Sequence, residues 1–374
     1  MKKKILFVLG TRPEAVKTAP LIKIFKKSSD FTTLVCTTGQ HKEMTEEILN
    51  FFEIKPDFDL KLMTHGQTLF DITVKALIGV GEIIDKTSPD LIFVQGDTTS
   101  VFAGSLAAFY KNVKVAHLEA GLRTGNKMFP FPEEINRILT GHIADYHFAP
   151  TGKAKENLNK EGIFENVYVT GNTVIDALFL AIEIIGKTEN NKFKETFNFL
   201  NLNKKIILVT AHRRENFGKP FENICNAILN LAENKDIEIV YPVHPNPNVK
   251  DVAYKLMGKT NNIHLTEPLP YPELVWLMNK SYLVLTDSGG IQEEAPSLGK
   301  PVLVLRNETE RTEGIEAGTV KLVGTDKNKI ISEALKLLND KDYYNKMQQK
   351  VNPYGDGTTS EQILKILTTQ ISKI

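Results

Sequence analysis

Several short apolar runs of this sequence end directly in acidic residues. Asp97 comes soon after the run 91–95 and Glu119 comes directly after the run 113–118, while Glu133 opens a segment with helical periodicity. Carboxylates at such positions are suited to general acid and base catalysis. Asp97 could instead cap the next helix, and Glu133 could simply begin one. Glu119 has no comparable capping role, because it stands between an apolar run and a glycine turn.

Cationic side chains are placed where an anion would explain them. Arg12 and Lys17 lie at the start of the helix expected over 14–27, a helix end that disfavours positive charge. His212 directly follows the apolar run 205–210 and has arginines behind it, so it could contact a phosphate. Alternatively, Arg12 and Lys17 are solvated surface cations and His212 has a structural role.

A polar glycine pair lies between two further apolar runs. Ser288, Gly289 and Gly290 follow a strand expected over 282–286 and open a short helix, an arrangement typical of a phosphate-binding turn. The alternative is a tight turn with no ligand. Glu293, Glu294 and Arg311 lie near the same expected edge, and Pro296 predicts that the helix is short or kinked.

The elements that position these residues alternate between apolar strands and helices along the whole chain. Strands that are apolar throughout predict parallel sheets covered by helices on both faces. The pattern restarts after residues 167–176. We therefore predict an α/β protein of two Rossmann-like, doubly wound domains facing one another across a cleft, with ligands at the carboxyl ends of the strands.

Length and composition agree with that architecture. A chain of 374 residues with 41% hydrophobic and 24% charged residues is expected to form two globular domains. The net charge of +1 gives no reason to expect nucleic acid or a membrane surface as a partner. No apolar run approaches the length of a membrane span, and Cys36 and Cys225 are expected to be buried thiols. We expect a cytoplasmic protein.

The charge pattern suggests a ligand that carries a diphosphate, held between cations of one domain and carboxylates of the other. A nucleotide-sugar enzyme would fit. The sequence has no dinucleotide-binding glycine motif, no nucleophile elbow, no P-loop and no His/Cys cluster with metal-ligand spacing, so no cofactor and no metal are expected.

An ordered set of motifs resembles one family closely and over nearly the whole length. The motifs are GTRPEAVK (10–17), GDTTS (96–100), HLEAGLRTG (117–125), PEEINR (132–137), TGNTVIDAL (170–178), AHRRENFG (211–218), YPVHPNP (241–247), TDSGGIQEEAPSLGKPVLVLR (286–306), ETER (308–311) and NPYGDG (352–357). Together they are similar to the non-hydrolysing UDP-N-acetylglucosamine (UDP-GlcNAc) 2-epimerases.

The resemblance implies a GT-B-like fold, with domains at 1–172 and 173–357 and a C-terminal helix (358–374) that packs back on the first domain. It implies interconversion of UDP-GlcNAc and UDP-N-acetylmannosamine (UDP-ManNAc) through loss and return of UDP, in a homodimer that supplies sugars for surface polysaccharide. The implied catalytic residues are Asp97, Glu119, Glu133 and His212, and the implied substrate-binding residues are Arg12, Lys17, Ser288, Gly289, Gly290, Glu294 and Arg311.

The family pattern also suggests an allosteric UDP-GlcNAc site at Gln40, His41, Arg213 and His244. Gly66 departs from that pattern, so activation is a hypothesis. Other departures near the pocket are Leu269, Leu274 and Thr312. Alternative functions are a 2-epimerase of another UDP-2-acetamido sugar, a GT-B glycosyltransferase, a hydrolysing relative or a non-catalytic UDP-sugar sensor.

Overall fold

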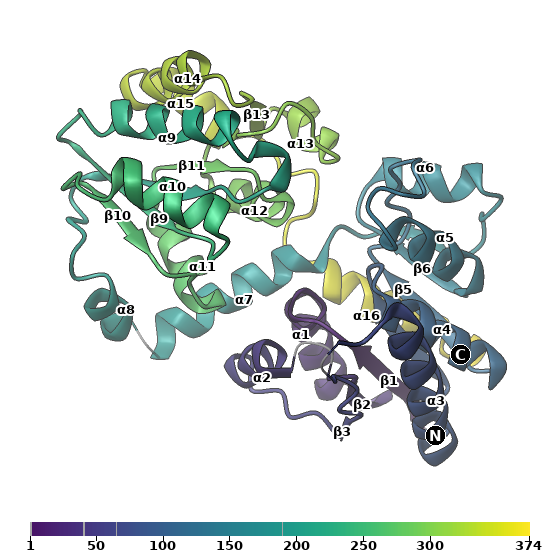
Figure 1. Ribbon diagram of the computed structural model, residues 1–374. Helices are drawn as coiled ribbons and strands as arrows, with labels where there is room; N and C mark the ends of the chain where they lie inside the picture. Colours follow the sequence, from purple (N-terminus) through teal and green to yellow (C-terminus); the bar gives the residue numbers. More distant parts are fainter. Residues whose placement is uncertain (1, 40–41, 65, 189) are drawn as a thin grey trace. The chain divides into compact units, whose positions relative to one another are not determined.

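A computed structural model describes residues 2–39, 42–64, 66–188 and 190–374 (Figure 1). The chain forms two compact units, one of Met1–Leu180 with Tyr354–Ile374 and the other of Ala181–Pro353. Each unit is built on one parallel sheet with helices between successive strands, which confirms the predicted doubly wound α/β class.

The first unit contains a seven-stranded sheet in the order β3-β2-β1-β4-β5-β6-β7. Its strands are β1 (Lys3–Leu9), β2 (Phe31–Thr37), β3 (Phe58–Asp59), β4 (Leu91–Gln95), β5 (Lys114–Leu118), β6 (Tyr146–Ala149) and β7 (Val167–Val169). Its helices are α1 (Arg12–Lys27), α2 (Lys42–Phe51), α3 (Leu69–Thr87), α4 (Thr99–Tyr110), α5 (Glu133–Ile143), α6 (Gly152–Lys160), the first part of α7 (Thr173–Thr188), and α16 (Thr359–Thr369), followed by the 3-10 turn η3 (Ile371–Lys373). The strand order reverses between β1 and β4, so ligands are expected where these strands end.

The second unit contains a six-stranded sheet in the order β10-β9-β8-β11-β12-β13. Its strands are β8 (Lys205–Thr210), β9 (Ile237–Pro242), β10 (Ile263–Thr266), β11 (Leu283–Thr286), β12 (Val302–Val304) and β13 (Val320–Leu322). Its helices are α8 (Asn190–Thr196), α9 (Lys219–Leu231), α10 (Pro247–Met257), α11 (Tyr271–Lys280), α12 (Gly289–Glu294), α13 (Thr312–Ala317), α14 (Lys327–Asn339) and α15 (Lys341–Gln348), with 3-10 turns η1 (Arg214–Asn216) and η2 (Ala295–Leu298). Here the order reverses between β8 and β11.

The last segment of the chain is bonded into the first unit. The backbone N–H of Ser360 donates to Asp176 at 2.6 Å, and the Thr359 hydroxyl donates to the Thr170 carbonyl at 2.9 Å. The N–H of Asn172 donates to the Tyr354 carbonyl at 2.7 Å. α16 also packs against α1.

The structure differs from the sequence-based expectation in a few short elements. The polar stretch around 189–203 predicts a pair of helices, and this prediction is wrong. Among its described residues, 190–203, α8 is the one helix, and the Asn201 side chain accepts from the Asn203 N–H in a local turn. Elements of two to six residues (β3, α13 and β13) were not predicted. The expected short helix before Pro296 is confirmed, since α12 gives way to η2 at Ala295.

Gly121, just after Glu119, provides a test of this packing. Its φ is +89°, and a Cβ there would lie 2.1 Å from the Ala154 carbonyl oxygen of α6. Gly121→Ala is expected to lower the free energy of unfolding by about 3–5 kcal/mol, from strain and overlap together. Gly162→Ala is the matched control, because φ is +83° and nothing lies within 4 Å. Equal losses in the two variants, measured by urea denaturation, would contradict the predicted overlap.

Candidate functional site

Glu119 is fixed by donors from three elements of the first unit. Lys17 Nζ of α1 lies 2.7 and 2.6 Å from the two carboxylate oxygens, and Asn172 Nδ2 donates to Oε1 at 3.1 Å. Gln95 at the end of β4 donates to Oε2. Glu119 has φ +60°, a left-handed conformation that costs a non-glycine residue on the order of 1–3 kcal/mol and is concentrated at functional sites. Lys17 therefore neutralises a positioned carboxylate and is not a solvated cation.

Asp97 lies in the loop after β4 and is held by α5. Arg137 donates to Asp97 Oδ2 at 2.5 Å, and Asn136 Nδ2 donates to the Asp97 carbonyl at 3.0 Å. The cap of α4 is Thr98, which accepts from the Val101 N–H, so the helix-cap interpretation of Asp97 is wrong. Sequence reasoning missed Asn136 and Arg137, although their spacing from Glu133 is helical.

Glu133 and its neighbour have different roles at the start of α5. Glu134 is buried and its carboxylate accepts the N–H groups of Thr124 at 3.0 Å and Gly125 at 2.9 Å, which fixes the preceding loop. The Glu133 side chain is half-buried and makes no hydrogen bond or ion pair with the residues that the structure describes. The structural role therefore belongs to Glu134, and Glu133 stays available to a ligand.

A buried histidine links the loops that carry Asp97 and Glu119. His117 on β5 donates from Nε2 to the Gly96 carbonyl at 2.7 Å. Burial lowers the pKa of His117 to about 3, so the ring is neutral and acts as a fixed donor. Sequence reasoning missed this residue, because a histidine inside an apolar strand gives no signal of its partner.

Glu14 is a buried acid in the first turn of α1. It accepts the Gly10 N–H at 2.6 Å and the Thr11 hydroxyl at 2.9 Å. Burial raises the pKa of Glu14 to about 7, although these hydrogen bonds oppose the shift. Arg12, in the same turn, is half-buried and has no ion pair among the described residues.

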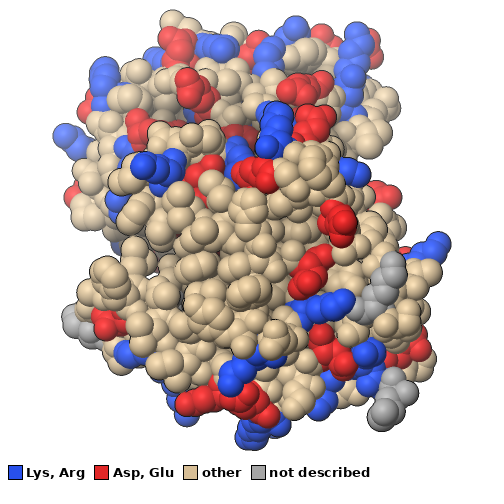
Figure 2. All heavy atoms as spheres, turned by 90° about the vertical axis from the view of Figure 1, so that its right-hand side faces the viewer, with Lys and Arg blue, Asp and Glu red and all other residues tan. Residues whose placement is uncertain are grey.

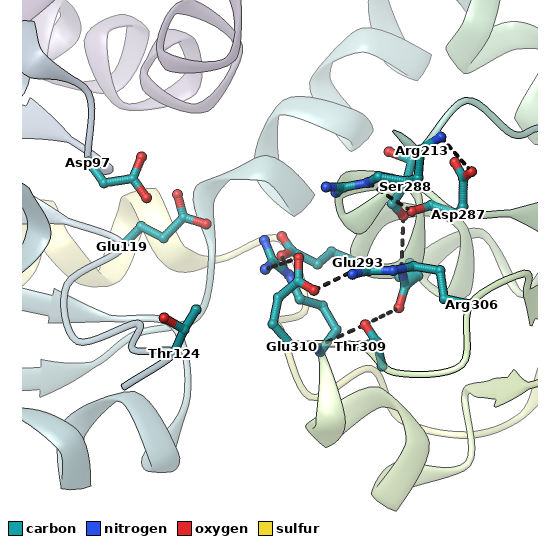
Figure 3. Close-up of polar contacts among 12 residues, drawn as sticks. Asp97, Glu119, Thr124, Arg213, Asp287, Ser288, Glu293, Arg306, Thr309 and Glu310 are labelled. Carbon is teal, nitrogen blue, oxygen red and sulfur yellow. Dashed lines mark hydrogen bonds and ion pairs between the residues drawn. The ribbon is translucent and has the colours of Figure 1, made fainter. Parts of the chain in front are cut away.

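In the second unit, Asp287 joins the ends of the two strands at the switch point. Its Oδ2 accepts the N–H groups of His212 and Arg213, both at 2.8 Å, and Asn216 Nδ2 at 3.1 Å. Figure 3 shows Asp287 beside Arg213. The His212 ring is partly exposed and stacks on His244 with ring centres 5.5 Å apart. Burial lowers the pKa of His212, and the Asp287 carboxylate opposes that shift.

An ion-pair network lies beside the glycine pair. Arg306, which is buried, contacts Glu215 at 2.6 Å and Glu310 at 2.7 Å. Arg311 contacts Glu293 at 2.7 Å and the same Glu310 at 3.1 Å. Figure 3 shows Glu293, Arg306 and Glu310 of this network. The two guanidinium groups hold the pKa of Glu310 down to about 2, against its burial. The network fixes Arg311 over the start of α12.

Gly289 and Gly290 are not demanded by the fold. Both are the first residues of α12, and neither has a positive φ. A Cβ on Gly289 would meet nothing closer than 3.5 Å, and a Cβ on Gly290 nothing closer than 3.4 Å, which are ordinary contacts. The tight-turn alternative therefore has no support from backbone conformation. Without side chains at these two positions, a ligand could come close to the backbone N–H groups at the start of α12.

The other predicted residues are placed as follows. Ser288 is the N-cap residue of α12, and Glu294 is its buried last residue. Gln40 and His41 lie outside the described residues. Within the described ranges there is no His/Cys/Asp/Glu group that could hold a metal ion and no helix that could span a membrane. On the face shown in Figure 2, acidic and basic side chains are interspersed.

Two parallel, doubly wound α/β units, with carboxylates at strand ends of the first and a glycine pair beside arginines in the second, are the architecture of a GT-B-like protein. The family model described as UDP-N-acetylglucosamine 2-epimerase matches residues 23–368. The chain is 53% identical over 374 residues to the UDP-N-acetylglucosamine 2-epimerase of Campylobacter jejuni, covering 98% of each. The chain therefore belongs to the UDP-N-acetylglucosamine 2-epimerase family, a family of isomerases, which confirms the resemblance.

Two solved structures show the same fold. One is a UDP-GlcNAc 2-epimerase from Neisseria meningitidis bound to UDP-GlcNAc, with 48% identity, a TM-score of 0.89, and coverage of 98% of this chain and 100% of that chain. The other is a putative UDP-N-acetylglucosamine 2-epimerase from Listeria monocytogenes, with 46% identity, a TM-score of 0.92, and coverage of 100% and 98%.

The raised pKa of Glu14 predicts a pH-dependent stability. The folded protein holds this proton up to about pH 7, whereas the unfolded chain releases it near its ordinary value of 4.5. The stabilising contribution is therefore complete below pH 4.5 and is lost as pH rises through 7, a change on the order of 3 kcal/mol. In urea denaturation from pH 4.5 to 8.5, the wild type should lose stability relative to Glu14→Gln. Parallel curves would contradict this prediction.

Proposed function

We propose that this protein catalyses the reversible C2 epimerisation of UDP-GlcNAc and UDP-ManNAc. The observation that carries the proposal is the constrained Glu119 carboxylate, held by Lys17, Gln95 and Asn172 within the same unit as Asp97. Family membership supports it independently. The proposed proton-transfer residues lie in the first unit, and most of the residues proposed to hold UDP lie in the second.

The proposed reaction is an elimination followed by an addition. A carboxylate accepts the C2 proton, the C–H electron pair becomes the C1–C2 double bond, and the C1–O bond breaks with its pair on the β-phosphate oxygen of UDP. The intermediate is 2-acetamidoglucal. Protonation of C2 on the opposite face and return of the UDP oxygen to C1 give the epimer, so atoms and electrons balance without an oxidant.

Each set of residues has a role in that sequence. Asp97, Glu119 and Glu133 are the proposed proton-transfer groups. His212, Arg12 and Arg311 are proposed to stabilise the charge that develops on UDP, with Ser288, Gly289 and Gly290 on its phosphates, Glu294 on its ribose and Lys17 beside the sugar. Support comes from Arg12, which has no ion pair among the described residues, and from two glycines that the fold does not require.

We also propose a regulatory UDP-GlcNAc site at Gln40, His41, Arg213 and His244, of which the structure describes Arg213 and His244. Arg213 donates from Nε to the Asp287 carbonyl at 3.3 Å, and His244 stacks on His212. A second UDP-GlcNAc bound against His244 and Arg213, as the family pattern suggests, would therefore touch groups that adjoin His212. The proposed setting is the cytoplasm, where the product would enter surface polysaccharide synthesis.

A homodimer through α3 is the proposed assembly. Phe70, Val74 and Ile78 recur at helical spacing along one face of α3 and are 84%, 53% and 57% exposed. Phe109 and Tyr110 at the end of α4, which packs against α3, are also exposed. Contiguous exposed apolar side chains on a protein of low net charge favour burial against a second copy.

Incubation with UDP-GlcNAc in D₂O tests the reaction. Proton loss and return at C2 predict UDP-ManNAc that carries deuterium at C2, followed by NMR. Asp97→Asn and Glu119→Gln should lower turnover at least about 100-fold, because each removes a proton-transfer group. Asp85→Asn, an exposed acid paired with Lys111, is the matched control and should retain activity.

Other outcomes would overturn the proposal. Epimer formed with protium retained at C2 would exclude the elimination, free N-acetylmannosamine would indicate hydrolysis, and binding without turnover would indicate a sensor. Full activity of both carboxylate variants would contradict the assigned roles.

The proposed assembly predicts that Val74→Glu with Ile78→Glu gives a monomer in analytical ultracentrifugation, because charge on the apolar face opposes its burial. Glu156→Lys changes an exposed position of α6, away from α3, and should leave the dimer intact. A wild type that sediments as a monomer at micromolar concentration would contradict the dimer.

A further inference from the structure

Asp287 is a fully buried acid whose two carboxylate oxygens have unequal surroundings. Oδ2 accepts three N–H groups, two from the backbone of the loop after β8 and one from Asn216. Oδ1 is buried and has no hydrogen-bond partner among the described residues. A buried carboxylate oxygen without a donor is unfavourable, so this one calls for an explanation.

The nearest ionisable donor to that oxygen is the ring of His212. Its Nδ1 lies 3.7 Å from Asp287 Oδ1, and a movement of about 1 Å would bring the two atoms to hydrogen-bond distance. The side chain of His212 is 40% exposed, whereas that of Asp287 is 0% exposed. The ring therefore has one nitrogen toward a buried carboxylate and the other free to meet a ligand.

We propose that Asp287 is a positioning residue that accepts the Nδ1–H of His212 and thereby directs Nε2 at the diphosphate of the ligand. The role of His212 toward UDP rests on the proposed function. When the anionic diphosphate arrives, the partly exposed ring takes up a second proton from solvent on Nε2, and this N–H donates to a phosphate oxygen. Asp287 and the diphosphate stabilise the imidazolium from opposite sides.

The other charged groups around His212 make this carboxylate necessary. Arg213 on the same loop and His244 from the loop after β9 both disfavour a positive ring, as does burial. Asp287, from the loop after β11, is the group that favours it. Without Asp287 the positively charged ring would lose the group that favours it, and a neutral ring could carry its single proton on either nitrogen.

The alternative is that Asp287 serves only to tie the loop after β8 to β11. Asp287→Asn separates the two roles, because the amide oxygen can still accept the backbone N–H groups while the amide nitrogen cannot accept from His212. Asn216→Ala is the matched control. It removes a donor to Oδ2 and a contact with the Leu305 carbonyl but leaves Oδ1 and the ring unchanged.

NMR of ¹⁵N-histidine-labelled protein, with His212 assigned through His212→Asn, tests the proposal. The ligand-free wild type should show the Nδ1–H tautomer, and saturating UDP at pH 7.5 should give the doubly protonated ring. Asp287→Asn should lose both signatures and lower kcat about 10–100-fold, as is typical when a partner that orients a functional histidine is removed. Asn216→Ala should keep both.

Two results would overturn the inference: an unchanged tautomer and UDP response in Asp287→Asn, or an equal change in Asn216→Ala. If Asp287→Asn does not fold, the tautomer of His212 in the ligand-free wild type decides. A proton on Nε2 with an unprotonated Nδ1 would exclude the proposed hydrogen bond to Asp287. The tautomer is measured without turnover. A wild type that shows it but does not epimerise UDP-GlcNAc would refute the proposed function and leave the pairing intact.

Discussion

The partly buried contact between Lys17 and Glu119 is the constraint on which the first unit depends. It draws a cation of α1 and an acid from the end of β5 together across β4, with Gln95 and Asn172 completing the carboxylate's partners. Charge-assisted hydrogen bonds of this kind are roughly twice as strong as neutral ones, which offsets the left-handed backbone of Glu119. A carboxylate so restrained pays no reorganisation when a sugar arrives.

In the second unit the charges are reversed, because acidic side chains there restrain basic ones. Asp287 fixes the loop that carries His212, and Glu310 bridges Arg306 and Arg311. Acids therefore position the groups proposed to receive UDP, just as a lysine positions an acid proposed to act on the sugar. Lys17 and Asp97 in the first unit, and His212 and Asp287 in the second, follow the strands between which the order of the sheet reverses. That is the place at which open α/β sheets bind ligands.

Strand and helix order could be predicted from the sequence, because apolar runs and helical periodicity are local. The carboxylates could be picked out because they follow such runs. Their partners could not be predicted, since Arg137 reaches Asp97 and His117 reaches the Gly96 carbonyl only through the fold. The sequence could not show that the backbone conformation leaves Gly289 and Gly290 replaceable by larger residues. Their φ angles and their neighbouring atoms are properties of the folded chain.

The most direct test of the central claim, that UDP leaves the sugar and returns, is positional isotope exchange in UDP-GlcNAc labelled with ¹⁸O at the oxygen between C1 and the β-phosphate. Departure of UDP frees that phosphate to rotate, so ¹⁸O should appear in its non-bridging positions as epimer accumulates, read by ³¹P NMR. Epimer formed with all of the label still in the bridge would show that the C1–O bond never breaks. That result would contradict the account.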